Sequence, residues 1–500
     1  MMLKPSSLFG NGAILCRNKE IRLFGEAGDG VTIRVRLENA EGTLLAEGSA
    51  KAENGRFLVT LPPQTVAIGC RLTFSDGNET RVSEDILIGD VYLAGGQSNM
   101  EMTLPGADEG LERMKSHEDP LLRYYNVPQK AFVGPEQREA AENAAWTAIR
   151  PGTGGDMSAV AYFFGQKARE ETDVPVGIID CYWGGTSITC WLDRETLESL
   201  EEGRRFLREY ETVCGNKDLE TFLKEESAWR EVLDGWNREV AAFRNDHLDA
   251  PWDQVEENCG KCPWNPPAGP GSPYRPAGLA DSMVKTVCPV ALTAILFYQG
   301  ETDAGATDQY GLLLETLVST WRSWFRDEKV PFLNVQLPMW LEEGKADSFT
   351  WPVIRKAQSE ARRTIPAYDM ICLLDQGEFN NLHPTRKRVV GERLWEAAKE
   401  TVFGRDARRS PRAEKVLFGV DSVEILADQP VCLRETEALM EIAGENGKYV
   451  TAKAETDGNR IRLTAEGIGQ ATKARYAWTD FATAAFFGEN GEPLEPFDFE

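Results

Sequence analysis

The stretch DVYLAGGQSNMEM, residues 90–102, runs from an apolar segment through two glycines to a lone serine. The apolar segment Val91–Ala94 is typical of a strand that is covered on both faces of a sheet. Gly95 and Gly96 have no Cβ and therefore allow the chain to turn sharply after that strand. Ser98 is then expected at the carboxyl end of the strand, which is the edge where open α/β sheets bind their ligands.

Short apolar runs of the same kind recur along the middle of the chain, at VGIIDCY (176–182), ALTAILFYQG (291–300), PFLNVQLP (331–338) and DMICLLD (369–375). Between them lie segments whose apolar residues recur every three or four positions, as expected of helices, at 157–170, 310–325 and 354–361. This alternation predicts a parallel α/β sheet with helices on both faces.

Both flanks of this region have a different pattern. Residues 1–88 consist of short alternating runs separated by Gly, Asn and Asp, which predicts a small antiparallel sandwich. Residues 410–500 are predicted to be β-rich in the same way. We therefore expect a central catalytic domain made of 89–194 and 256–409, interrupted by a helical insertion at 195–255.

The insertion carries one apolar stripe, formed by Trp229, Val232, Leu233, Trp236, Val240 and Phe243. Such a stripe is typical of a helical hairpin packed on the main domain. A second interpretation is a lid or wall over the functional site.

Charge and composition narrow the classes of partner. The formal net charge of −25 at pH 7 argues against nucleic acid and anionic lipid as partners. No apolar run reaches the roughly 18 residues that a membrane span needs. The N-terminal residues show no secretory signal pattern, so a cytoplasmic location is expected. Ten cysteines then indicate reduced thiols, and Cys259 and Cys262 in CGKC are interpreted as part of a loop rather than a metal or redox site.

The residues that follow the predicted strands suggest acyl-transfer chemistry. Ser98 follows the first strand, Gly184 and Gly185 the second, Gln299 the third, and the loop with His383 the last. A serine hydroxyl needs a neighbouring base, and a tetrahedral intermediate needs N–H donors that are already in place. Glycine N–H groups and an amide such as that of Gln299 are suitable donors. Of the three histidines, only His383 follows a core strand, whereas His117 and His247 lie in segments interpreted as solvated.

Four blocks, GGQSNM, WGGTSI, YQGETDA and NNLHP, resemble the conserved blocks of the SGNH hydrolases. Together with LFGNGAILCRNKEIRLFGEA, YRPAGLADSMV and RYAWTDF, they are most similar to the sialate O-acetylesterase-like branch, which contains many carbohydrate acetylesterases. The resemblance covers most of the chain outside the insertion. It implies an SGNH-type three-layer α/β/α fold and a serine esterase that needs no metal or other cofactor.

By position, the resemblance implies that Ser98 is the nucleophile and His383 the general base. It implies an oxyanion hole formed by the N–H groups of Ser98 and of the Gly184-Gly185 turn, represented by Gly185, together with the amide of Gln299.

One block departs from the superfamily, which has an aspartate three residues before the histidine, where this chain has Asn380. Asn381 follows, and its amide is a weaker support for the ring than a carboxylate. Asp375, a Ser–His dyad oriented by a backbone carbonyl, and Glu301 are the alternatives for orienting the ring.

Three functions follow from these observations. The resemblance favours removal of O-acetyl groups from carbohydrates, either xylan- or xyloglucan-type oligosaccharides or O-acetylated sialic acid. The alternatives are a lipase- or thioesterase-like enzyme of the same chemistry and a non-catalytic carbohydrate-binding protein. Tyr182, Trp183 and Tyr298 are candidates for stacking on sugars, whereas Trp191 is assigned to the core. Arg275 is a candidate for binding the sialic acid carboxylate, or alternatively braces its own loop.

Overall fold

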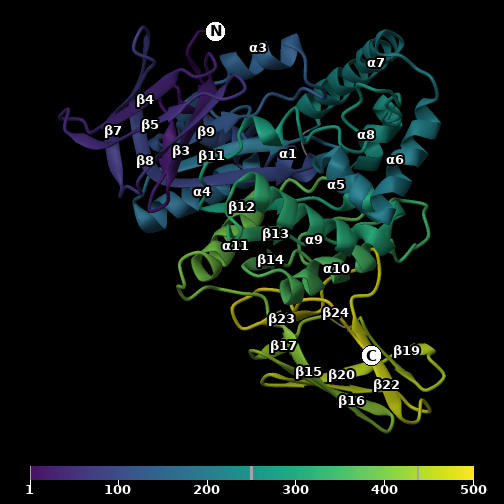
Figure 1. Cartoon of the computed structure of the whole chain (residues 1–500). Helices are drawn as coiled ribbons and strands as arrows, with labels where there is room; N and C mark the ends of the chain where they lie inside the picture. The colour runs from purple at the N-terminus through teal and green to yellow at the C-terminus, as the bar shows by residue number, and fades with distance from the viewer. Residues whose placement is uncertain (1, 248–249, 251, 436–438) are drawn as a thin grey trace.

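The computed structural model describes residues 2–247, 250, 252–435 and 439–500, and it has a mixed α/β fold built on one large sheet (Figure 1). The central strands are β8 (Thr80–Gly96), β9 (Asp119–Asn126), β10 (Trp146–Ile149), β11 (Val176–Tyr182), β12 (Ala294–Tyr298), β13 (Phe332–Val335) and β14 (Tyr368–Ile371). They lie in the order β10-β9-β11-β8-β12-β13-β14.

The central strands pair in parallel from β9 to β14, as the apolar runs predict. The prediction of a purely parallel sheet is wrong at one edge, because β10 pairs with β9 in the antiparallel direction. Neither β9 nor β10 is predicted from the sequence, since both are more polar than the runs at the centre. The next strands in the chain, β9 to β11, all lie on one side of β8, and the later strands, β12 to β14, lie on the other side. The carboxyl end of β8 is therefore a topological switch point.

Strand β8 joins the N-terminal strands to the central sheet. Its first half pairs with β7 (Ala67–Ser75) in the antiparallel direction, and its second half lies between β11 and β12. The predicted domain boundary after residue 88 therefore falls inside one continuous strand. The apolar residues of both regions also belong to one core.

The N-terminal strands alternate between the core and solvent. In β4 (Thr32–Glu38), Ile33, Val35 and Leu37 are fully buried, whereas Arg34 and Arg36 face solvent. The other strands of this region are β1 (Lys4–Pro5), β2 (Ile14–Cys16), β3 (Ile21–Glu26), β5 (Leu44–Lys51) and β6 (Arg56–Leu61).

Helices pack on the central sheet through aromatic side chains. The helices are α4 (Ala159–Thr172), α9 (Thr307–Trp324), α10 (Thr350–Thr364) and α11 (Lys387–Thr401). Phe164 of α4 packs on Tyr92 of β8, with ring centroids 4.7 Å apart. Trp321 of α9 lies against Gly95, three residues further along the same strand. Side chains alternate along a strand, so α4 and α9 lie on opposite sides of β8.

Helices α4 and α11 pack against each other very closely. A Cβ atom at Gly391 in α11 would lie 2.6 Å from the backbone nitrogen of Phe164, so only glycine fits there. Shorter helices outside this pair are α1 (Ser98–Glu101), α2 (Gly110–Ser116) and α3 (Pro135–Asn143), and 3-10 turns lie at 7–9, 104–106, 188–191, 284–286 and 301–305.

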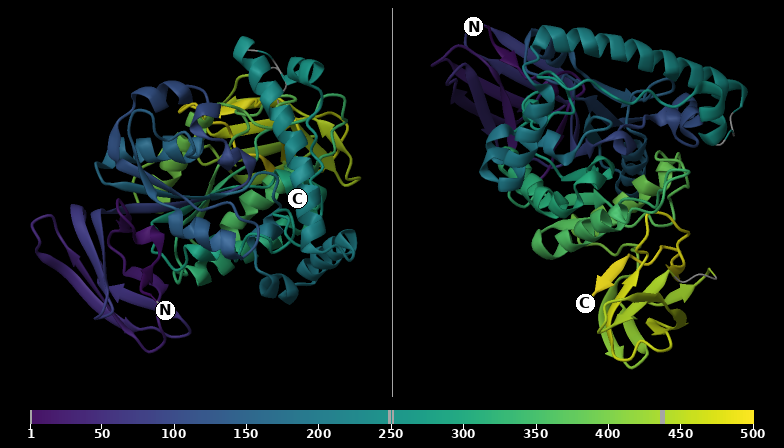
Figure 2. Two further views of the ribbon diagram at one scale, coloured as in Figure 1. Left: turned by 90° about the horizontal axis from the view of Figure 1, so that it is seen from above. Right: turned by 90° about the vertical axis from the view of Figure 1, so that its right-hand side faces the viewer.

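The insertion forms α5 (Arg194–Ser199), α6 (Glu201–Cys214), α7 (Leu219–Asp246) and α8 (Trp252–Cys259). Figure 2 shows α7 as a long helix along the outside of the molecule. Its predicted apolar stripe is not core, because Val232 is exposed and the other five residues are only half-buried. None of the described helices combines the length and apolar character needed to cross a membrane.

The C-terminal strands form a separate lobe with a core of its own (Figure 1). The lobe contains β15 (Ala413–Gly419), β16 (Ser422–Ala427), β17 (Val431–Leu433), β18 (Met440–Gly444), β19 (Tyr449–Thr451), β20 (Lys453–Asp457), β21 (Arg460–Thr464), β22 (Ala471–Tyr476), β23 (Phe486–Gly488) and β24 (Phe497–Phe499). Met339, Cys372 and Leu374 of the central region also belong to this core.

Candidate active site

The chain turns at the end of β8, and the turn requires glycine. Gly96 has a φ of 135°, and a Cβ atom there would lie 2.0 Å from the carbonyl oxygen of Tyr298. The same carbonyl accepts a hydrogen bond from the N–H of Gln97 at 3.0 Å. Ser98 then begins α1 and is partly accessible, although its neighbours Gln97 and Asn99 are buried.

The structure brings Ser98 and His383 together across 285 residues of sequence. Nε2 of His383 lies 2.8 Å from Oγ of Ser98. His383 is in the loop between β14 and α11, so both side chains lie at the carboxyl edge of the sheet. Burial, together with the nearby charge of Lys387, lowers the pKa of His383 to about 4. The ring is therefore neutral near pH 7 and can accept the serine proton.

Two backbone N–H groups beside Ser98 are available to a ligand. In the described part of the chain, neither the N–H of Ser98 nor that of Gly185 has an acceptor. The N–H of Gly184 is already bonded to the carboxylate of Glu101, which also accepts from Gln129 at 2.7 Å. Gly184 lies directly against the nucleophile loop, because a Cβ atom there would be 3.3 Å from Cβ of Ser98.

Gln299 lies at the same edge but has a different task from the one predicted. Its side-chain nitrogen donates to Oε1 of Gln97, to the carbonyl of Thr186 and to Oδ2 of Asp303. Its own oxygen accepts from the hydroxyl of Tyr310 at 3.3 Å. Because the two hydrogens of the amide are already shared among these acceptors and the residue is fully buried, Gln299 is not free to bind an oxyanion.

Asp375 does not orient the ring of His383 in this structure. Its carboxylate forms a double ion pair with Arg393, with N–O distances of 2.7 and 2.8 Å. Arg393 in turn contacts Glu492 at 2.5 Å, and all three side chains are largely buried. Asp375 thus ties the end of the last strand to α11 and to the C-terminal lobe. In the described residues no carboxylate bonds to His383, which leaves a Ser–His pair.

Asn99 and Glu301 form a buried support behind the pair. The side-chain nitrogen of Asn99 donates to Oε1 of Glu301 at 2.7 Å and to the carbonyl of Leu382 at 3.0 Å. Oδ1 of Asn99 accepts from Nζ of Lys387 at 2.5 Å. Asn99 thereby connects the loops that carry Ser98 and His383. Burial lowers the pKa of Lys387 to about 7, although the charge of Glu301 opposes this shift.

The two asparagines before His383 shape its loop rather than its ring. Oδ1 of Asn381 accepts from the backbone N–H of His383 at 3.1 Å. The side chain of Asn380, which has a φ of 54°, bonds to Asp253 of α8. The predicted use of the Asn381 amide as a ring acceptor is therefore replaced by a backbone contact.

Several residues of the site were not predicted from the sequence. Asp303 accepts from Oγ of Ser187 at 2.7 Å and from the N–H of Ile188 at 2.9 Å, so it ties the second block to the third. Lys387 and Glu101 were also missed. Their spacing was a usable signal, because Lys387 follows His383 by four residues and Glu101 follows Ser98 by three.

Some predicted side chains have other roles. Tyr182, Trp183 and Tyr298 are buried and offer no open face to a sugar, and Trp191 lies in the core as expected. Arg275 donates to the carbonyl of Ser272 at 2.6 Å and braces its own loop.

The other histidines and the CGKC cysteines lie apart from the site. His117 is half-buried rather than fully solvated, and its ring bonds to the hydroxyl of Tyr162 at 2.6 Å. His247 is exposed and stacks on Phe243. Cys259 ends α8, and it and Cys262 are free thiols. Within the described ranges, no group of three or more His, Cys, Asp or Glu residues is arranged to hold a metal ion.

The chain is similar to several known carbohydrate esterases. Residues 269–400 match the family described as carbohydrate esterase, sialic acid-specific acetylesterase. The chain is 24% identical to the sialate O-acetylesterase of Mus musculus, over 91% of this chain and 86% of that protein. It is 23% identical to the sialate O-acetylesterase of Homo sapiens, over 76% of this chain and 67% of that protein.

A solved structure also matches along the whole length. The crystal structure of a carbohydrate acetylesterase from Xanthomonas citri superimposes with a TM-score of 0.76 and 25% identity, covering 99% of both chains. Together, the family match, the curated relatives and the solved structure support a sialate O-acetylesterase-like carbohydrate esterase, which is a carboxylic ester hydrolase.

Proposed function

We propose that this enzyme removes O-acetyl groups from carbohydrates through an acetyl-enzyme on Ser98, with His383 as the general base. The contact of 2.8 Å between Oγ of Ser98 and Nε2 of His383, at the switch point of the sheet, carries this proposal. The relatives named for acetyl removal from sugars support the choice of acyl group.

The positions of Ser98, His383 and the two free N–H groups suggest the following reaction steps. Oγ of Ser98 attacks the acetyl carbonyl while Nε2 of His383 takes its proton. The N–H groups of Ser98 and Gly185 receive the developing oxyanion. The C–O bond to the sugar breaks, the sugar oxygen takes the proton from His383, and acetyl-Ser98 remains. Water, deprotonated by His383, then attacks the ester; the bond between the acetyl carbon and Oγ breaks, Oγ of Ser98 takes the proton back from His383, and acetate leaves.

We also propose the SGNH-type three-layer arrangement for the central domain. The packing of α4 and α9 on opposite sides of β8 supports it. Within this arrangement the pair works as a dyad, with Asn99 and Glu301 holding the two loops in place instead of a third catalytic carboxylate.

The pH profile is expected to reflect the low pKa of His383. Protonation removes the general base, so kcat/KM for p-nitrophenyl acetate should fall as the pH decreases through about 4, rather than through the ordinary value of 6.5. The measurement is initial rates between about pH 3.5 and 8, with circular dichroism at each pH to confirm folding. A midpoint between about 6 and 7 would show that the pKa of His383 is not lowered in the free enzyme.

A release assay tests the function itself. Acetate release is measured from acetylated xylo- and xyloglucan-oligosaccharides and from O-acetylated sialic acid, beside p-nitrophenyl acetate, butyrate and octanoate. We expect acetylated sugars and acetate esters to be preferred at least about tenfold over the octanoate ester, in line with the acetyl specificity for which the relatives are named. Preference for octanoate would favour the lipase-like alternative, and no hydrolysis of any ester would favour a binding protein.

A further inference from the structure

The helical insertion and the loop that follows it contact the active site at two separate places. On one side, Trp264 lies against the oxyanion-side glycine: a Cβ atom at Gly185 would be 2.3 Å from Cζ2 of the indole. On the other side, Asp253 of α8 bonds to Asn380, three residues before His383. The insertion and the loop after it therefore lie beside the two loops that carry Gly185 and His383.

Trp264 is held by other aromatic rings but remains open to solvent. Trp229 of α7 packs edge-on at 5.8 Å between ring centroids, and Tyr274 packs at 5.5 Å. The indole N–H of Trp229 donates to the carbonyl of Pro263 at 3.0 Å, which fixes the residue before Trp264. Even so, 45% of Trp264 is exposed. Because its neighbours already hold this large ring in place, the side chain loses little conformational entropy when a ligand stacks on it.

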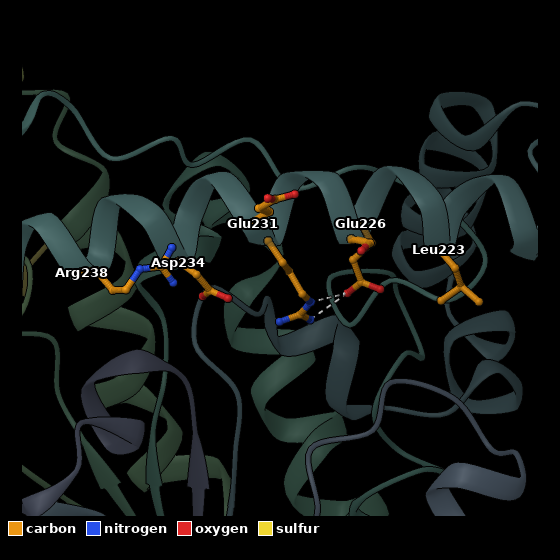
Figure 3. A pocket seen from close by; sticks show the side chains of 7 residues that line it. Leu223, Glu226, Glu231, Asp234 and Arg238 are labelled. Carbon is orange, nitrogen blue, oxygen red and sulfur yellow. Dashed lines mark hydrogen bonds and ion pairs between the residues drawn. The ribbon is translucent and has the colours of Figure 1, made fainter.

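An open, polar hollow lies along α7, and all of its lining residues belong to that helix. It measures about 510 Å³, and Figure 3 shows the side chains of Glu226, Asp234 and Arg238 extending from one side of the helix into it. Arg230 lines the hollow and pairs with Glu226 at 2.7 Å. Arg230 also lies beside the aromatic group, because its guanidinium is 5.9 Å from the ring of Trp229.

Tyr274 connects the hollow to the site. Burial raises the pKa of the Tyr274 hydroxyl to about 12. The nearby charge of Arg230 on α7 lowers this pKa, and the charge of Glu101 beside Ser98 raises it. The aromatic group, which consists of Trp229, Trp264 and Tyr274, thus lies between the reaction centre and the charged face of α7. Apolar rings next to carboxylates and guanidinium groups match the two surfaces of a sugar, which are its C–H face and its hydroxyl groups.

We propose that Trp264 is a stacking platform for a pyranose ring of the acetylated substrate, and that the hollow along α7 receives the next sugar residues. The inference rests on the proposed function and adds an oligosaccharide subsite to it. Because Arg230 is already neutralised by Glu226, the subsite suits neutral sugars such as those of acetylated xylo-oligosaccharides.

The distances permit one substrate to reach both places. Gly184 contacts Ser98, Gly185 is the next residue, and consecutive Cα atoms are about 3.8 Å apart. Trp264, which packs on Gly185, is therefore separated from Ser98 only by the Gly184-Gly185 turn. An acetyl group on Ser98 and a sugar on Trp264 belong to a single ligand.

The test separates sugar binding from ester chemistry. Trp264→Ala is expected to raise KM for an acetylated xylo-oligosaccharide at least about tenfold more than KM for p-nitrophenyl acetate, whose change reports any effect that acts through Gly185. Trp264→Phe, which keeps a flat ring, should restore most of the loss. Trp236→Ala is the matched control: Trp236 also lies on α7, donates its N–H to the carbonyl of Gly260 and packs edge-on against Trp252, but it does not contact Gly185.

A direct binding measurement tests the sugar subsite even if the enzyme does not hydrolyse these sugars. The affinity of the Ser98→Ala enzyme for the oligosaccharide is measured by calorimetry with and without Trp264→Ala, and a loss of at least about tenfold is expected. Equal losses with both substrates in the kinetic test, no change with either, or no binding by Ser98→Ala would overturn the inference. Failure of the proposed function is seen separately, as a wild-type enzyme that binds these sugars but releases no acetate from them.

Discussion

Replacing Ser98 with alanine is expected to lower kcat for acetyl release by about 10⁵-fold, to a rate supported only by binding and backbone donors. The physical reason is that Oγ of Ser98 is the only hydroxyl within hydrogen-bond distance of Nε2 of His383 among the described residues. Without it no acetyl-enzyme forms. The measurement is kcat with p-nitrophenyl acetate, together with mass spectrometry of the quenched enzyme for an added acetyl group.

Ser187→Ala is a suitable control for this prediction. Ser187 lies in the loop after the neighbouring strand, but its hydroxyl donates to Asp303 at 2.7 Å and not to His383. Its kcat should stay within about tenfold of wild type. An unchanged kcat in Ser98→Ala, with folding intact, would show that another group attacks the ester.

Replacing His383 with glutamine is expected to lower kcat by about 10⁴-fold or more, because the serine proton then has no acceptor of suitable basicity. The amide preserves much of the ring volume, so folding should be retained. Rates are measured from pH 4 to 9, and a wild-type-like pH profile in the variant would contradict the assignment of His383 as the base.

Asp375→Asn is the matched comparison for the orientation of the ring. A Ser–His–Asp triad would lose about 10³- to 10⁴-fold in kcat, whereas the structure places Asp375 against Arg393. We therefore expect kcat within about tenfold of wild type and a free energy of unfolding lower by about 3 kcal/mol, because a buried guanidinium loses one partner. Denaturant unfolding and kcat on the same sample separate the two outcomes.

The strands of the central sheet were predictable because burial on both faces demands continuous apolar runs. Residues 91–94, 176–182 and 294–298 satisfy this demand without help from distant residues. Strand β10 was not predictable in this way, since its four residues gain their pairing from β9 and its neighbours rather than from their own pattern. The continuity of β8 through the predicted boundary at residue 88 also depends on partners from two different regions.

The site was partly predictable for a similar reason. Ser98 and His383 each follow a core strand directly, and parallel strands bring their carboxyl ends to one edge. The contacts of the other side chains in these loops depend on which neighbouring groups the fold places beside them. Gln299 was predicted as an oxyanion donor, but Gln97, Thr186 and Asp303 occupy its amide.

The sequence by itself determined the α/β alternation, the glycine turn that presents Ser98, and the position of His383 at the same edge, because these depend on local patterns. Only the tertiary structure decided that Asp375 pairs with Arg393, that Asn99 joins the two catalytic loops, and that Trp264 lies against Gly185. Each of these is a contact between residues 18 to 283 positions apart. Such contacts depend on the packing of the whole chain, where buried charges and amides must find partners wherever the fold supplies them.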